Sequence, residues 1–137
     1  MTPPTMAGWN LALRFGLELG ALAGMGFAAW TFTSGPARWV AATLAPVTAA
    51  IIWGVFNVLD DPSRSGAAPV EVSGWVRLAI ELLVLGGGAA AFAFAGRRNI
   101  AIAFALLIVF HYAASSNRIE WLIQSDGDSA IGSSGSL

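Results

Sequence analysis

Four long stretches of this sequence consist mostly of apolar residues, and polar residues gather between them. The stretches cover about residues 11–32, 39–59, 75–95 and 99–117, and each approaches the roughly 20 residues that a helix needs to cross a bilayer. The second and fourth contain no Asp, Glu, Lys or Arg. The pattern predicts an all-α integral membrane protein with four transmembrane helices.

Short turn-forming segments connect the predicted helices in pairs. Residues 33–36 read Thr-Ser-Gly-Pro, and residues 96–98 read Gly-Arg-Arg. Such segments favour tight turns, so the first and second helices, and the third and fourth, should form two hairpins. The polar segment 60–74 joins one hairpin to the other.

The two ends of the chain are expected to lie outside the membrane domain, which covers residues 9–124. Residues 1–8 form an N-terminal tail, and residues 125–137, rich in Ser, Gly and Asp, are predicted to be disordered. No basic residue precedes the first apolar stretch, and Arg14 and Glu18 interrupt it. It therefore differs from a signal peptide, and we interpret it as a retained helix.

Composition supports lipid as the surrounding medium. Hydrophobic residues make up 56% of the 137 residues and charged residues 11%, against roughly 25% charged residues in soluble domains. The mean hydropathy is +0.69. We expect a multi-pass protein of the bacterial cytoplasmic membrane with the lipid bilayer as its partner. The arginines are divided between the two sides of the predicted domain, so their distribution sets no orientation.

Composition also excludes several functions. The chain contains no cysteine, which excludes disulfides, thiolate metal sites and thiol catalysis. Its net charge of −1 gives no reason to expect nucleic acid as a partner.

The sequence Arg-x-x-x-Glu-Leu occurs twice, from Arg14 to Glu18 in the first stretch and from Arg77 to Glu81 in the third. Two membrane crossings separate the copies, so both should point the same way. The repeat indicates two duplicated parallel-repeat hairpins, related by a pseudo-twofold axis along the membrane normal, that form a four-helix bundle.

The four residues of the repeat form a predicted intramembrane charge cluster. A charge near the centre of a span costs roughly 2.5 to 3.5 kcal/mol on insertion scales. Within one helix, Arg four residues before Glu is the poorer order for an ion pair. We therefore expect crossed pairs between helices, Arg14 with Glu81 and Arg77 with Glu18.

Two interpretations of this cluster stay open. It is either a polar staple that fixes the register of the helices, which we favour, or a site that handles protons or ions. His111 lies at about the depth of the two glutamates in the predicted fourth helix, and it is a candidate relay for the second interpretation.

Small residues recur at every fourth position of the first stretch, at Gly16, Gly20 and Gly24, on the face opposite Arg14 and Glu18. Gly87 follows the same pattern in the third stretch. Such rows allow close helix approach in membranes. We expect packing inside the bundle; a homo-oligomer seam is the alternative.

Several of these segments resemble the YrdB-like family of small bacterial membrane proteins. The similarity lies in Asn10–Phe15 with Glu18-Leu19, in Pro46 and Trp53–Phe56 of the second stretch, and in the second motif at Arg77 and Glu81. The resemblance implies a four-helix membrane fold and no particular activity.

The leading functional prediction is a non-enzymatic structural or accessory membrane protein, because no phosphate loop, metal-ligand cluster or nucleophile–base arrangement is recognisable. We expect no catalytic residues, metal or cofactor, and the sequence identifies no protein partner. The alternative is a proton-coupled small-molecule transporter or ion pathway that uses Glu18 and Glu81.

Overall fold

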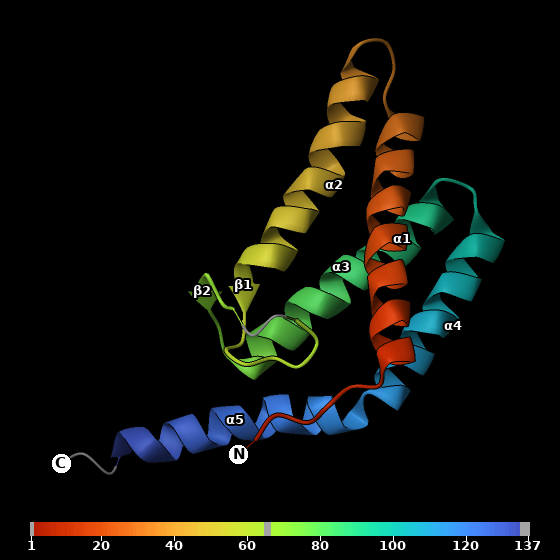
Figure 1. The fold of residues 1–137 in the computed structure, drawn as a ribbon. Helices are drawn as coiled ribbons and strands as arrows, with labels where there is room; N and C mark the ends of the chain where they lie inside the picture. The colour runs from red at the N-terminus through yellow and green to blue at the C-terminus, as the bar shows by residue number, and fades with distance from the viewer. Residues whose placement is uncertain (1, 65–66, 135–137) are drawn as a thin grey trace.

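The computed structural model describes residues 2–64 and 67–134, and most of these residues are helical (Figure 1). The helices are α1 (Gly8–Phe32), α2 (Ala37–Val55), α3 (Gly74–Phe94), α4 (Arg98–Ala114) and α5 (Ser116–Ser134). Two short strands, β1 (Phe56–Asn57) and β2 (Val70–Glu71), pair in parallel at the two ends of the α2–α3 connection. The predicted helical class is confirmed.

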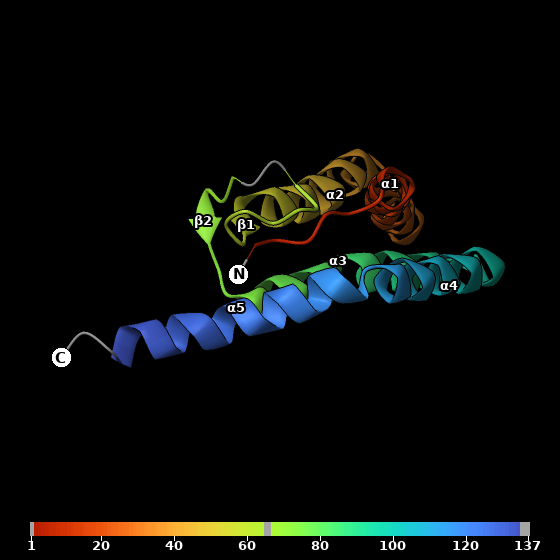
Figure 2. The ribbon, with the colours of Figure 1, turned by 60° about the horizontal axis from the view of Figure 1, so that its bottom comes forward.

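The helices form two layers, which are seen best in Figure 2. One layer is the α1–α2 hairpin, and the other contains the α3–α4 hairpin with α5. Helix α1 contacts α2 in its own layer and both α3 and α4 in the other. The β strands, α5 and the N-terminal segment gather at one end of the molecule, opposite the α1–α2 turn (Figure 1).

The two hairpin turns lie where the sequence predicted them. Gly35 has a φ of 60° and Gly96 a φ of 81°, a left-handed conformation that glycine adopts without steric cost. After Gly96, the Arg97 N–H donates to the Phe92 carbonyl at 2.8 Å. This bond closes the end of α3 by a Schellman motif and sends the chain back into α4.

Helices α1 and α3 approach closely where two small residues meet. A Cβ atom added to Gly88 would lie 2.5 Å from Cα of Ala21, and one added to Gly24 would lie 3.0 Å from the Gly88 carbonyl oxygen. Leu17, Leu85 and other apolar residues continue the contact as the core of the two layers. The close approach explains why this crossing needs residues without bulky side chains.

The four glycines predicted to pack against other helices differ in their surroundings. Gly20 faces Phe104 of α4, Gly24 faces α3, and Gly87 lies against Met25 of α1. Gly16 has nothing within 4 Å of an added Cβ, so it belongs to no close contact in the described chain. Because α1 lies between α2 on one side and the second layer on the other, its charged face and much of its glycine face both meet neighbouring helices.

The fourth predicted helix, 99–117, corresponds to α4 and the first residues of α5. The chain bends by 67° between these two helices and then continues as a helix beyond residue 117. At the bend, the Ser115 hydroxyl donates to the His111 carbonyl at 2.8 Å and accepts from the Asn10 side chain at the same distance. A serine that bonds back to a preceding carbonyl often bends a helix. The second helix also ends earlier than predicted, at Val55.

The tail that the sequence predicted to be disordered is helical as far as Ser134, and residues 135–137 lie outside the described residues. Its first part is held by α3: the Asp126 carboxylate accepts from the backbone N–H groups of Gly74, at 2.8 Å, and Trp75, at 3.1 Å. A carboxylate at a helix N-terminus satisfies free donors and complements the helix dipole. Composition alone does not reveal this long-range contact.

Three helices, α1, α2 and α3, are long and apolar enough to cross a membrane. The count rises to four if α4 and the first part of α5 are taken as one bent span.

Candidate functional site

The centre of the molecule is the carboxylate of Glu81 in α3, which is 0% exposed. Guanidinium groups from three helices donate to it: Arg14 of α1 at 2.8 Å, Arg77 of α3 at 2.9 Å and Arg118 of α5 at 2.6 Å. The hydroxyl of Tyr112 in α4 donates to its second oxygen at 2.9 Å. One carboxylate therefore joins four helices.

Arg118 carries the network from Glu81 to the α2–α3 loop. Its guanidinium donates to both oxygens of Asp61, at 2.8 and 2.5 Å, and to both oxygens of Glu81, at 3.0 and 2.6 Å. Arg118 and Asp61 are each 1% exposed. A planar guanidinium suits such paired contacts, so this residue fastens α5 and the loop to the same point.

Asp61 is the one acid of this network that lies in a loop. Burial alone would raise its pKa, but hydrogen bonds and charge from Arg118, with hydrogen bonds from Ser63, outweigh burial and hold the pKa below its ordinary value of 3.8. The ionised form is the one that these donors stabilise.

Arg77 ties α3 to the end of α2. Its Nη1 group donates to the carbonyls of Trp53, at 2.8 Å, and Phe56, at 2.7 Å. The guanidinium carbons of Arg77 and Arg14 lie 4.6 and 5.0 Å from the centre of the Trp53 ring, within cation–π range. A cation at this position satisfies terminal carbonyls and complements the C-terminal end of the α2 dipole.

Of the two expected crossed pairs, Arg14 with Glu81 is present and Arg77 with Glu18 is not. Arg77 pairs with Glu81 of its own helix, and Glu18 pairs with Arg14 of its own helix at 3.3 Å. Arg118 and Tyr112 also donate to Glu81 and complete its shell of donors. Glu18 has one ion pair within the part of the chain that the structure describes, and its side chain is 23% exposed.

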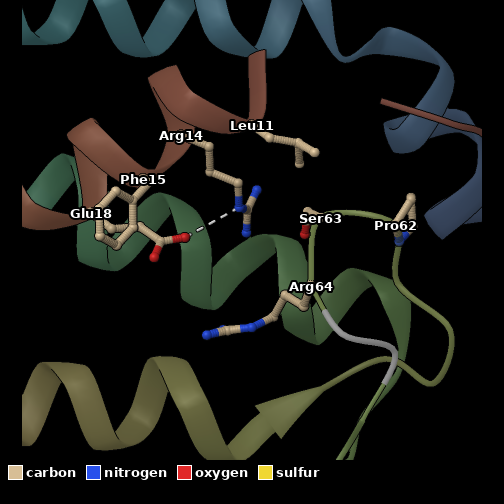
Figure 3. Close-up of a pocket in the computed structure, with 7 residues that line it drawn as sticks. All are labelled: Leu11, Arg14, Phe15, Glu18, Pro62, Ser63 and Arg64. Atoms are coloured by element: carbon tan, nitrogen blue, oxygen red, sulfur yellow. Dashed lines mark ion pairs between the residues drawn. The ribbon is translucent and has the colours of Figure 1, made fainter. Parts of the chain in front are cut away.

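Glu18 borders an open pocket of about 450 Å³ between α1 and the α2–α3 loop (Figure 3). Arg14 and Phe15 line the α1 side, and Ser63 and Arg64 line the loop side. In Figure 3 the Arg64 side chain extends from the loop toward the side of the pocket on which Glu18 lies. The pocket therefore places a partly exposed carboxylate and a second guanidinium next to the buried network.

His111, the predicted relay, belongs to a separate buried group. Its Nδ1 lies 2.7 Å from the Asn10 side-chain oxygen, and the Asn10 amide donates to Ser115. Within the described residues, no hydrogen bond joins the imidazole to a carboxylate or guanidinium of the charge cluster. The geometry indicates a contact that binds the start of α1 to the α4–α5 bend.

Sequence reasoning missed three members of the network: Asp61, Tyr112 and Arg118. Asp61 lies in a predicted loop and Arg118 lies just beyond the last predicted span, and charges are ordinary in both places. A signal was present for Asp61, because Asp before Pro-Ser favours a turn in which the carboxylate accepts from the chain two residues on. The Ser63 N–H makes that bond at 2.9 Å.

The described residues do not form a cluster of metal ligands. They contain no group of three or more His, Asp or Glu side chains arranged to hold a metal ion. The buried acids instead have arginine partners, which occupy the oxygens that a metal would need.

Comparison with known proteins identifies a family. Residues 12–109 match the model of a family described as "Protein of unknown function (DUF2568)". The chain is 42% identical over 114 residues to the uncharacterized protein YrdB of Bacillus subtilis, an alignment that covers 83% of this chain and 93% of the relative. No solved structure matches. Since both matches cover most of the chain, it belongs to the YrdB-like family, DUF2568.

Proposed function

We propose that this chain is a small multi-pass membrane protein whose role is structural or accessory and not enzymatic. The buried network around Glu81 acts as the polar staple that holds its helices together. The two hairpins carrying the Arg-x-x-x-Glu motif are a duplication, and α1, α2, α3 and the bent α4–α5 pair are its four membrane segments. The bacterial cytoplasmic membrane is its location.

The observation that carries this proposal is the distribution of charged and apolar side chains. Arg14, Arg77, Arg118 and Glu81 are at most 1% exposed, whereas large apolar side chains such as Leu83 and Phe94 are 74% and 77% exposed. A soluble protein of this size would bury the second group and expose the first. Lipid accounts for both, because buried polar groups inside a bilayer must find partners within the protein.

Aromatic residues support the same location. Trp30 and Trp39 pack edge to face with ring centres 4.7 Å apart at the α1–α2 turn, and Arg38 lies over the Trp30 ring. Trp9 and Trp75 are exposed near the opposite end, at the starts of α1 and α3. Tryptophans at both ends of a helical bundle are typical of proteins that meet two membrane interfaces.

A second candidate is a proton-coupled small-molecule transporter or ion pathway that uses Glu18 and Glu81. The pocket beside Glu18 favours it. The surroundings of Glu81 oppose it, because guanidinium groups from three arginines stabilise the ionised carboxylate and arginine does not release a proton at physiological pH. Of the two acids, Glu18 has fewer guanidinium partners among the described residues and is the one that borders the pocket.

Two measurements test the proposed function. Membranes from cells that express the chain are washed with alkaline carbonate; the chain should stay in the membrane pellet and require detergent for release, and recovery in the wash would refute a membrane-spanning fold. Purified chain is then placed in lipid vesicles with a pH gradient. The structural role predicts no proton flux above that of empty vesicles, whereas flux that Glu18→Gln abolishes would establish the transport alternative.

A further inference from the structure

The pocket in Figure 3 is lined by a carboxylate from α1 and a guanidinium from the α2–α3 loop that are not paired with each other. Glu18 and Arg64 both line it, yet no ion pair with an N···O distance of 4.0 Å or less joins them within the described residues. Arg64 donates to the Trp53 carbonyl at 3.3 Å and has no carboxylate partner among those residues. Among the described residues, Glu18 forms an ion pair with Arg14 alone, and Arg14 also pairs with Glu81.

We propose that this pocket binds the headgroup of a phospholipid that carries a phosphate and a primary ammonium group, as phosphatidylethanolamine does. The phosphate pairs with the Arg64 guanidinium, and the ammonium group pairs with the Glu18 carboxylate. Charged hydrogen bonds of both kinds are among the strongest that proteins make with ligands. This inference rests on the membrane location proposed above.

The walls of the pocket match a lipid better than a water-soluble ligand. Leu11, Phe15 and Pro62 contribute apolar surface beside the two charges. The Phe15 side chain is 61% exposed, and Leu19 one turn farther along α1 is 52% exposed. Acyl chains below a bound headgroup would cover this apolar surface, which continues along α1 from the pocket.

The Glu18 carboxylate distinguishes between headgroups. A primary ammonium group donates hydrogen bonds to a carboxylate, whereas the quaternary ammonium of phosphatidylcholine has no N–H group to donate. A phosphatidylglycerol headgroup keeps the phosphate and lacks the cation. The arrangement therefore predicts preference for the amine lipid, with Glu18 responsible for discrimination and Arg64 for phosphate affinity.

The test uses the full chain in detergent micelles and native mass spectrometry. Phosphatidylethanolamine, phosphatidylcholine and phosphatidylglycerol with identical acyl chains are added separately, and the dissociation constant of each complex is measured. The wild-type chain should bind phosphatidylethanolamine about tenfold more tightly than phosphatidylcholine, a difference of about 1.4 kcal/mol. Equal affinity for these two lipids would overturn the assignment.

Two variants separate the contributions of the charges. Glu18→Gln should bring the affinities for the ethanolamine and choline lipids together and leave phosphatidylglycerol binding unreduced. Arg64→Gln should weaken binding of all three lipids about tenfold. Arg98→Gln, an exposed arginine at the α3–α4 turn, is the matched control and should change none of them. If Arg98→Gln weakened lipid binding as much as Arg64→Gln, binding would depend on overall positive charge and the assignment of the pocket would be wrong.

The source of the headgroup is tested by competition. Soluble phosphoethanolamine should displace the lipid only at concentrations far above that of the lipid, because it lacks acyl chains. Displacement at equal concentration would overturn the lipid assignment in favour of a soluble ligand. Arg64 lies outside the buried network, so its variant keeps the test decisive if Glu18→Gln does not fold. Carbonate extraction reports separately on the membrane location, so failure of headgroup selectivity leaves that proposal intact.

Discussion

Glu18 and Glu81 occupy the same position in two copies of one motif, four residues after an arginine, and their surroundings differ in almost every respect. Glu81 is fully buried and accepts hydrogen bonds from three arginines and a tyrosine. Glu18 borders an open pocket and pairs with one arginine. In both copies the arginine contacts the glutamate of its own helix.

The difference arises from elements that approach only one copy. Helix α5 brings Arg118 to Glu81, and α4 brings Tyr112. The equivalent region beside Glu18 faces the α2–α3 loop, where Arg64 stays outside ion-pair distance. The same local sequence therefore gives a fully buried carboxylate in one copy and a carboxylate beside an open pocket in the other. The neighbouring helices and loops decide how many hydrogen-bond donors each carboxylate receives.

The largest expected effect is that of Glu81→Gln. It removes the negative charge between three buried guanidinium groups, and leaving a buried charge without its partner costs about 3 to 5 kcal/mol. The free energy of unfolding in mixed detergent micelles should fall by that amount, or the variant should fail to accumulate in membranes. Glu18→Gln is the matched control, with an expected loss of about 1 kcal/mol or less because its pair is partly exposed. Similar losses in the two variants would remove the distinction between the sites.

Removal of the α5 contact should have the next largest effect. Arg118→Gln removes the charged donor of Asp61 and one of the three arginines of Glu81, but Ser63 still donates to Asp61 and two arginines still donate to Glu81. The loss should therefore lie near the lower end of the range of about 3 to 5 kcal/mol for a broken buried ion pair. The same variant should increase proteolysis in α5, since Arg118 holds the start of this helix to the loop and to α3. Arg98→Gln at the exposed α3–α4 turn serves as the control; unchanged stability and protease resistance in Arg118→Gln would contradict the role given to α5.

The crossing of α1 and α3 can be tested without altering a charge. Gly88→Ala would place a Cβ atom 2.5 Å from Cα of Ala21, so the helices must move apart. Overpacking of this kind costs about 1 to 3 kcal/mol. Gly16→Ala has nothing within 4 Å of its added Cβ and should leave the unfolding free energy unchanged or slightly raised. A large loss in Gly16→Ala would show that the glycine face of α1 packs differently.

A smaller effect should appear in the pH dependence of stability. The pKa of Asp61 is lower in the folded chain than its ordinary value of 3.8. Its stabilisation is therefore complete above that unfolded value and is lost as pH falls through the lower folded value. Asp61→Asn should have a lower free energy of unfolding than the wild type at pH 7. Between about pH 5 and 1, where such a carboxylate becomes protonated, the variant should lose less further stability than the wild type. Asp60→Asn, the same substitution at the exposed neighbouring position, is the matched control and should keep the wild-type stability at pH 7.

The sequence predicts the four apolar helices well, misses most of α5 and predicts the charge network only in part. Hydrophobic runs locate the helices and turns such as Gly96 because these depend on local composition. The contact between Arg14 and Glu81 also follows from the sequence, because two copies of a motif separated by two predicted helices are expected to point the same way. The pairing of Arg118 with Asp61 and Glu81 does not follow, because it requires the bend at Ser115 that brings α5 back against α3.

Arg14 provides the most direct test of the account, since it contacts both glutamates. Two double-mutant cycles, Arg14→Gln with Glu81→Gln and Arg14→Gln with Glu18→Gln, measure the two coupling free energies in the same micelles. If Glu81 holds the helices together and Glu18 lies in an open pocket, the coupling free energy should exceed about 1 kcal/mol in the first cycle and stay below about 0.5 kcal/mol in the second. Equal couplings, or a larger one with Glu18, would contradict the assignment of Glu81 as the charge that holds the helices together.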